Sequence, residues 1–208
     1  MAHVFATDST RRRLQAAADA IEARSSAEIV IAVRAAATDM RAAALIGGTV
    51  CSFLGLLFSL FAPPEISLEF IAVLDVAWFV LGALAVVASP GLARLLTADA
   101  RLTRAVQQAA RATFVELGVH TTRGRTGVLV FIALREAQIV VIGDTAMDRR
   151  RDPEIARAFA AIEAVPHELG LGEEAVSMLE RALAQLGDVL HERLPRADDD
   201  VNELGELG

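Results

Sequence analysis

The sequence of 208 residues contains no lysine and only one cysteine. All 20 of its basic residues are arginines, which we interpret as the coding bias of a GC-rich genome and hence as a sign of a bacterial source. The single cysteine, Cys51, lies inside an apolar run. The chain therefore cannot form an internal disulfide or a cysteine-rich zinc site.

Other catalytic signatures are missing as well. The segment Gly124-Arg125-Thr126-Gly127 lacks the lysine and the length of a phosphate-binding loop, so it predicts a glycine turn that enters a strand. No serine lies in a nucleophile elbow, which leaves no candidate for covalent catalysis. The histidines lack the spacing of a helical zinc-protease motif, because none has a partner four residues away: His3, His120, His167 and His191.

Charge excludes a further class of function. The formal net charge is -7, and the acidic excess is concentrated in residues 198–206. Nucleic-acid binding requires a clustered basic face in a favourable overall field, which this composition does not provide. Residues 1–26 are polar and contain three consecutive arginines, so they do not form a signal peptide, and we expect the N-terminus to remain in the cytoplasm.

Two long apolar runs dominate what the sequence does contain. Apolar residues make up 54% of the chain, and the mean hydropathy is +0.44. Residues 42–62 carry no charge, and residues 70–89 carry only Asp75. Each run has the roughly 20 residues with which a helix crosses about 30 Å of hydrocarbon.

The arginines around these runs predict their orientation. The connection between the runs, residues 63–69, contains no arginine, whereas arginines precede and follow the pair: Arg34, Arg41, Arg94, Arg101 and Arg104. Positive residues stay on the cytoplasmic side. We therefore expect a multi-pass protein of the bacterial inner membrane, with a transmembrane hairpin and with both termini in the cytoplasm.

Polar and small residues within the hairpin leave two questions open. Asp75 lies about a turn and a half past Glu69, where interfacial water can reach it, although a functional intramembrane carboxylate is the alternative. Ala44, Gly48 and Ser52 recur at every fourth residue. This small-residue face predicts close packing, either between the two helices of the hairpin or between two copies of the chain in a homo-oligomer.

The remaining sequence predicts one domain that the hairpin interrupts. Strand-like runs at residues 28–33, 127–134 and 138–142 alternate with helical patterns at residues 14–21, 95–117, 153–162 and 176–190. This order predicts an α/β fold in which helices sandwich a small mixed β-sheet, with strands one and two parallel. The expected divisions are 1–41 and 92–194 for the cytoplasmic domain, 42–91 for the hairpin, and 195–208 for an acidic disordered tail.

This topology gathers polar residues at the membrane-distal edge of the sheet. Carboxylates there can hold a divalent cation, Ca or Mg, and guanidinium groups can hold an anion or a protein partner. The predicted metal ligands are Glu28, Asp144 and Asp148. The predicted anion- or partner-binding residues are Arg123, Arg125, Arg149, Arg150 and Arg151. The alternative is that all of them are turn and cap residues with exposed ion pairs.

Three segments resemble the TPM domain family, in its bacterial form with a membrane hairpin inside the domain. They are Ala23-Arg24-Ser25-Ser26-Ala27-Glu28-Ile29-Val30, Thr122-Arg123-Gly124-Arg125-Thr126-Gly127-Val128-Leu129-Val130, and Ile139-Val140-Val141-Ile142-Gly143-Asp144. The similarity extends from about residue 14 to residue 194.

The resemblance implies a TPM-like fold and two kinds of function. Members of the family are linked to the maintenance of photosynthetic membrane complexes and to receptor modulation, and a metal-dependent acid phosphatase activity has been proposed for some. Asp144 and Glu28 are similar to the family's acidic residues after the third strand and at the start of the first. Residues 145–151 depart from the family by being unusually basic. We therefore expect an accessory module that binds the lipid bilayer and a protein partner in the membrane; the alternative is a divalent-metal phosphatase.

Overall fold

The computed structural model describes residues 4–37, 41–61, 67–89, 91–92, 99–170 and 172–196. These residues form two compact units: residues 1–37 together with 104–208, and residues 38–103. Residues 63–66 of the predicted loop and residues 197–208 of the predicted tail lie outside the described residues. The last two residues of the predicted loop, residues 68–69, belong to α3. The first two residues assigned to that tail are described, and Pro195 forms an antiparallel bridge with Ser25.

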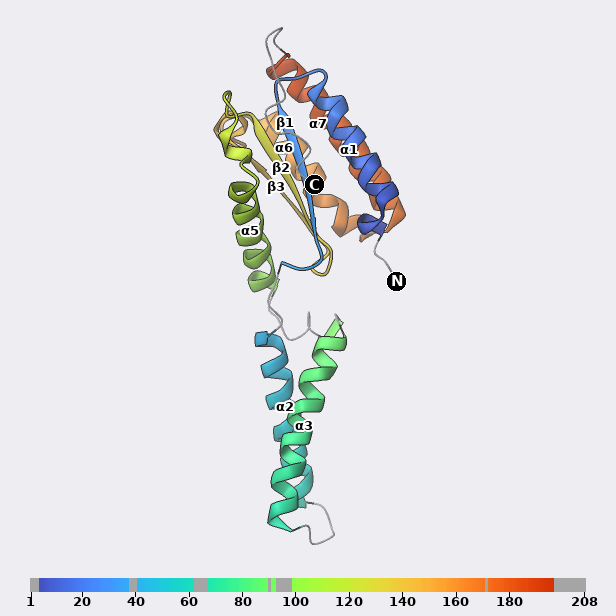
Figure 1. Cartoon of the computed structure of the whole chain (residues 1–208), viewed down its shortest axis with the longest axis vertical. Coiled ribbons are helices and arrows are strands. Elements are labelled where there is room, and N and C mark those ends of the chain that lie inside the picture. The colour runs from blue at the N-terminus through green and yellow to red at the C-terminus, as the bar shows by residue number, and fades with distance from the viewer. Residues whose placement is uncertain are drawn as a thin grey trace. The chain divides into compact units, whose positions relative to one another are not determined.

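The first unit is a mixed α/β domain (Figure 1). Its helices are α1 (Asp8–Glu22), α5 (Asp99–Glu116), α6 (Pro153–Leu169) and α7 (Glu173–Arg193), with α5 belonging to this unit from residue 104 onward. Its strands are β1 (Glu28–Arg34), β2 (Gly127–Ala133) and β3 (Gln138–Gly143). Three short 3₁₀ helices complete the described part: η1 (Val4–Ala6), η2 (Val119–Thr121) and η3 (Thr145–Met147).

The three strands form one mixed sheet in the order β1-β2-β3. β1 pairs with β2 in parallel, and β2 pairs with β3 antiparallel through the short turn at residues 134–137. This confirms the predicted mixed sheet and the parallel pairing of the first two strands. Both β1 and β3 are edge strands.

Local capping fixes where two of the helices begin. Thr7 precedes α1, and its side-chain oxygen accepts a hydrogen bond from the backbone N–H of Thr10. Asp152 precedes α6, and one carboxylate oxygen accepts from the backbone N–H of Glu154 at 2.8 Å. Pro153 follows at the first helical position, where its missing N–H costs no hydrogen bond. The start of α6 at Pro153 agrees with the predicted pattern, and α1 begins six residues before the predicted one.

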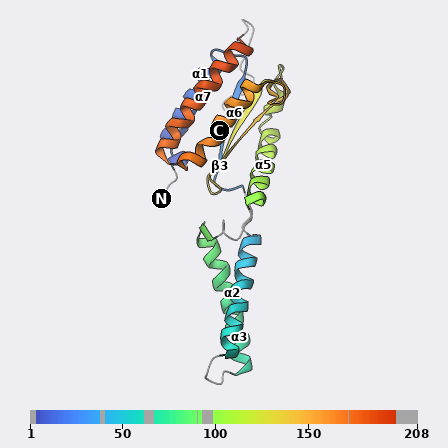
Figure 2. The same cartoon turned by 180° about the vertical axis from the view of Figure 1, so that it is seen from behind.

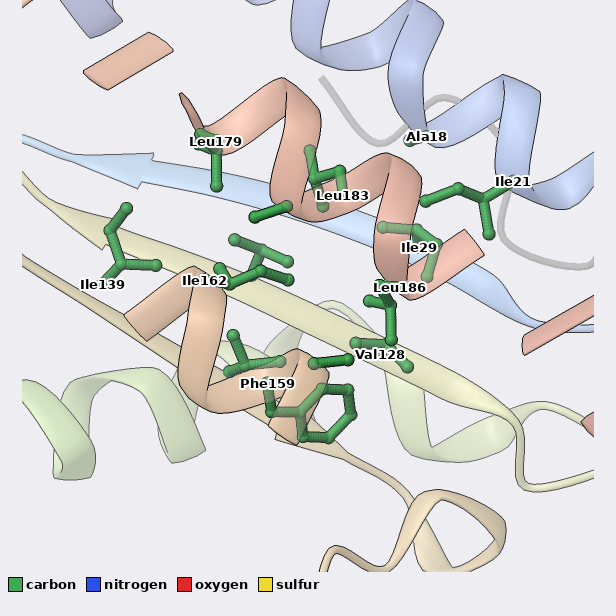
Figure 3. Packing of buried hydrophobic residues seen from close by; sticks show 14 of the residues in the cluster. Ala18, Ile21, Ile29, Val128, Ile139, Phe159, Ile162, Leu179, Leu183 and Leu186 are labelled. Atoms are coloured by element: carbon green, nitrogen blue, oxygen red, sulfur yellow. The ribbon is translucent and has the colours of Figure 1, made fainter. Parts of the chain in front are cut away.

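The core of the domain lies on both faces of the sheet. On one face, side chains of all three strands pack against apolar residues of α1, α6 and α7 (Figure 3). On the other face, Leu129, Phe131 and Ala133 of β2 pack against Val106 and Ala110 of α5. Every residue of the central strand β2 is buried, which explains its uninterrupted apolar sequence.

The second unit is a pair of long apolar helices, α2 (Arg41–Phe61) and α3 (Leu68–Ala88). Both are long and apolar enough to cross a membrane. The two helices run side by side in both views (Figures 1 and 2). They pack closely because small residues lie between them: a Cβ added to Gly82 would lie only 2.6 Å from the carbonyl oxygen of Gly47.

The small-residue face of α2 is wider than the sequence suggested. Gly48 lies against Phe79 of α3, and Ser52 donates a hydrogen bond of 2.7 Å to Asp75. The neighbouring row also faces inward, because Gly47, Gly55 and Ser59 are buried while Ala44 is only half-buried. A second period of four, one residue earlier than the predicted one, thus forms much of this contact: Ala43, Gly47, Cys51, Gly55 and Ser59.

Candidate functional site

The register of the sheet brings the predicted polar residues to one end of it. Glu28 is paired with Gly127, and Val128 is paired with Gly143. The start of β1, the start of β2 and the end of β3 therefore share one end of the sheet. The turn before β2 contains Arg123 and Arg125, and Asp144 directly follows β3. We call this region the polar end of the sheet.

Arg125 connects the turn before β2 to the segment after β3. Its guanidinium donates a hydrogen bond of 2.8 Å to the backbone oxygen of His120, and its Nη1 lies 3.8 Å from Oδ2 of Asp144. Its own backbone oxygen accepts from the N–H of Ala146. Arg125 also has a φ of 53°, in the left-handed region, where a non-glycine residue requires support from its surroundings. These contacts supply that support.

Asp144 is buried beside Arg125, with a side chain that is 7% exposed. Its Oδ1 accepts a hydrogen bond of 2.6 Å from the backbone N–H of Thr145 and so caps η3. Within the described residues, its Oδ2 has the Arg125 ion pair but no hydrogen-bond donor. A buried carboxylate oxygen in this state is held chiefly by the nearby positive charge.

Asp148 organises a separate local turn. Its Oδ1 accepts from the backbone N–H of Arg150 at 2.9 Å, and its Oδ2 lies 3.6 Å from the guanidinium of Arg151. The side chain of Arg151 is 85% exposed. Asp148 therefore serves as a turn residue, and the side chains of Arg150 and Arg151 are exposed.

The three predicted metal ligands are not gathered into one set. In the part of the chain that the structure describes, no group of three or more His, Cys, Asp or Glu side chains could hold a metal ion. Glu28 is buried at the start of β1, Asp144 faces Arg125, and Asp148 faces its own turn. This arrangement offers positive charge at the surface more readily than a cage of oxygen ligands.

Arg149 has a different partner from the other arginines of its run. It binds both carboxylate oxygens of Glu163 on α6, at 3.0 and 3.2 Å, and it donates to the backbone oxygen of Val141. Its guanidinium also lies over the ring of Phe159 at 5.3 Å. Arg149 thus connects β3 to α6, although its side chain is 43% exposed. Arg150 and Arg151 are exposed as well.

Glu163 and His120 are residues that the sequence patterns did not single out. Glu163 stands next to the apolar stripe of α6, a position from which a carboxylate can reach the sheet; that position was the available signal. His120 is half-buried near Phe114, and its Nδ1 has no hydrogen-bond partner among the described residues. A lone histidine gives no comparable signal in the sequence.

An ion-pair cluster follows this region at the start of α6. Arg193 of α7 lies 3.2 Å from Asp152 and 2.6 Å from Glu154. The backbone N–H of Glu154, which donates to the Asp152 carboxylate, lowers the pKa of that carboxyl below its usual value of 3.8, and Arg193 lowers it further. The hydrogen bond with Glu154 likewise raises the pKa of Arg193. The cluster therefore fixes α7 to the first turn of α6.

Comparison with known protein families, with characterised proteins and with solved structures finds no match to this chain. The resemblance to the TPM domain family therefore stays a prediction from the three quoted segments.

Proposed function

We propose that this chain is a membrane-anchored interaction module: the α2–α3 hairpin holds the α/β domain at a lipid bilayer, where the domain docks on a membrane protein complex. The observation that carries the proposal is the arrangement of side chains on the hairpin. Many large apolar side chains of both helices are exposed, and the small residues of α2 lie against α3.

The outward side chains need an apolar environment. Only 17% of the most apolar stretch of α2, and only 11% of that of α3, is buried within the chain. The core helix of a soluble protein would be mostly buried, so this comparison favours lipid contact. Among the exposed side chains, Phe53, Phe58 and Phe61 are 59%, 68% and 84% exposed. A bilayer would cover all of this surface.

The docking surface that we propose is the exposed positive charge at the polar end of the sheet. Arg150 and Arg151 extend from a turn that Asp148 holds in place. Arg123 and Arg125, in the turn before β2, are also exposed. Guanidinium groups on a fixed turn suit an acidic protein surface, because each can bind a carboxylate through two parallel hydrogen bonds.

The geometry does not favour the alternative of a divalent-metal phosphatase. Such a mechanism needs oxygen ligands around one ion and a basic group beside the phosphate. The described residues provide the arginines, but Glu28, Asp144 and Asp148 have separate surroundings. We therefore do not propose catalysis.

The docking proposal is tested by charge reversal in the cells that make this chain. Membranes are solubilised in digitonin, and the size of the complex that contains the chain is measured on a native gel. We expect Arg150→Glu/Arg151→Glu to shift the chain from a large complex to a small species. The matched control is Arg11→Glu/Arg12→Glu, which reverses two adjacent exposed arginines on α1 and should leave the large complex intact. A wild-type chain that migrates alone would contradict the proposal.

A further inference from the structure

The two edges of the sheet differ in how their backbone groups are satisfied. In an edge strand, every second residue directs its N–H and C=O away from the sheet. On β1 these are Ile29, Ile31 and Val33, because the alternate residues, from Glu28 to Arg34, bond to β2. On β3 they are Ile139, Val141 and Gly143.

The β3 edge is closed at its centre. The outward N–H of Val141 donates to Oε1 of Glu163 at 3.0 Å, and its outward oxygen accepts from Arg149. Arg149 and Glu163 form an ion pair, and the guanidinium of Arg149 lies over the ring of Phe159. No further strand can pair there without breaking this ion pair.

The β1 edge is closed only at its start. The N–H of Ile29 donates to Glu22 of α1 at 2.9 Å. Within the described chain, the outward N–H and C=O groups of Ile31 and Val33 make no hydrogen bond. No helix crosses in front of β1 in Figure 1, and the view from behind brings β3 to the front (Figure 2).

The side chains of β1 are also less covered than those of its neighbour. All seven residues of β2 are buried, whereas residues 30–33 of β1 are only half-buried. β1 contains no proline, glycine or internal charge that would discourage pairing, since its charges lie at the two ends. Its last residue, Arg34, has a side chain that is 53% exposed and lies 3.7 Å from Glu116.

We propose that residues 31–34 of β1 accept an extended segment of another protein, which adds a fourth strand to the sheet. The segment would bond to the outward groups of Ile31 and Val33, place apolar side chains beside residues 30–33, and place an acidic side chain beside Arg34. Backbone pairing of this kind supplies affinity, and the side chains supply specificity.

Amide hydrogen exchange of the full chain in nanodiscs, followed by NMR, tests the proposal. The probe is an acetylated peptide of alternating valine and threonine that ends in glutamate. In the free chain, we expect the amides of Ile31 and Val33 to exchange rapidly while that of Val141 is protected. A saturating concentration of the peptide should slow exchange at Ile31 and Val33 at least tenfold and leave Val141 unchanged.

Val33→Pro provides the matched variant. It removes one outward N–H from an edge strand, so pairing with β2 should persist while protection by the peptide is lost. Unchanged exchange at Ile31 and Val33 with the wild-type chain would overturn the proposal. Protection that is present without peptide and is lost on dilution would show self-association and would also overturn it. Alkaline extraction of membranes containing Val33→Pro reports membrane attachment separately.

Discussion

The domain and the hairpin bury opposite kinds of residue. In the domain, large apolar side chains such as Phe131 and Leu183 are completely buried, whereas charged side chains such as Arg150 and Arg151 are exposed. In the hairpin, glycines and serines of α2 are buried, and side chains such as Phe58 and Leu60 are exposed. Water drives apolar side chains into the core of the domain. In the lipid environment that we propose for the hairpin, that force is absent, and close approach of small residues and interhelical hydrogen bonds would hold the pair together.

Replacing a phenylalanine by alanine should change stability very differently in the two units. We expect Phe131→Ala to destabilise the domain by about 3–5 kcal/mol, because it leaves a cavity in a fully buried site. Phe58→Ala, at a side chain that is 68% exposed, should leave the folding of both units unchanged. Thermal unfolding in detergent, followed by circular dichroism, measures both. Equal losses of stability would show that the outer face of the hairpin is packed against protein.

Small residues should be indispensable in the hairpin only where the helices touch. Gly82→Val places atoms against the backbone of Gly47 and should cost about 1–3 kcal/mol, because backbone cannot move aside as a flexible side chain can. Gly91→Val is the control, since a Cβ there meets nothing within 4 Å. The single tryptophan, Trp78, lies against Gly55, so its fluorescence during titration with SDS reports separation of the helices.

The hydrogen bond between the two helices should make a smaller contribution. Ser52→Ala removes the donor to Asp75, and we expect a loss of about 0.6–2 kcal/mol in the same titration. Ser59→Ala serves as the comparison, because the Ser59 hydroxyl bonds to the oxygen of Gly55 on its own helix. If both variants behave alike, the Ser52–Asp75 contact does not hold the helices together.

The smallest effect concerns the capping carboxylate of the domain and depends on pH. The folded-state pKa of Asp152 lies below its usual value of 3.8, so its ionised form adds stability above about pH 3.8. That contribution is lost as the pH falls through the folded-state pKa. Asp152→Ala should therefore lower the Tm at pH 7. In acid, the Tm of the variant and the Tm of the wild type should lie closer together. The control is Asp19→Ala, which removes an exposed carboxylate within α1 that caps no helix.

The sequence predicts those parts of the fold that depend on local pattern. The uninterrupted apolar run of β2, the β-branched run of β3 and the helical spacing of apolar residues in α7 identify their elements without any knowledge of tertiary contacts. The parallel pairing of β1 with β2 followed from the helix between them, because a crossover must return the chain to the same end of the sheet.

The site was harder to predict because it depends on side-chain direction. Sequence order brought Arg125 and Asp144 to the same end of the sheet, and the two form an ion pair. Sequence order does not reveal that Asp148 turns toward its own loop or that Arg149 reaches back to Glu163. In the hairpin, both Ala44 and Ala43 begin a period of four, and only the helix crossing shows that residues of both rows face α3.

The central claim is that lipid covers the outer surface of the hairpin, and alkaline carbonate extraction of membranes that contain the full chain tests it most directly. Carbonate releases proteins that are held by charge or by other proteins, but it leaves membrane-spanning helices in the bilayer. We predict that the chain stays in the pellet and is released only by detergent. Complete release into the supernatant would contradict the account and would assign the exposed apolar surface of α2 and α3 to a protein partner.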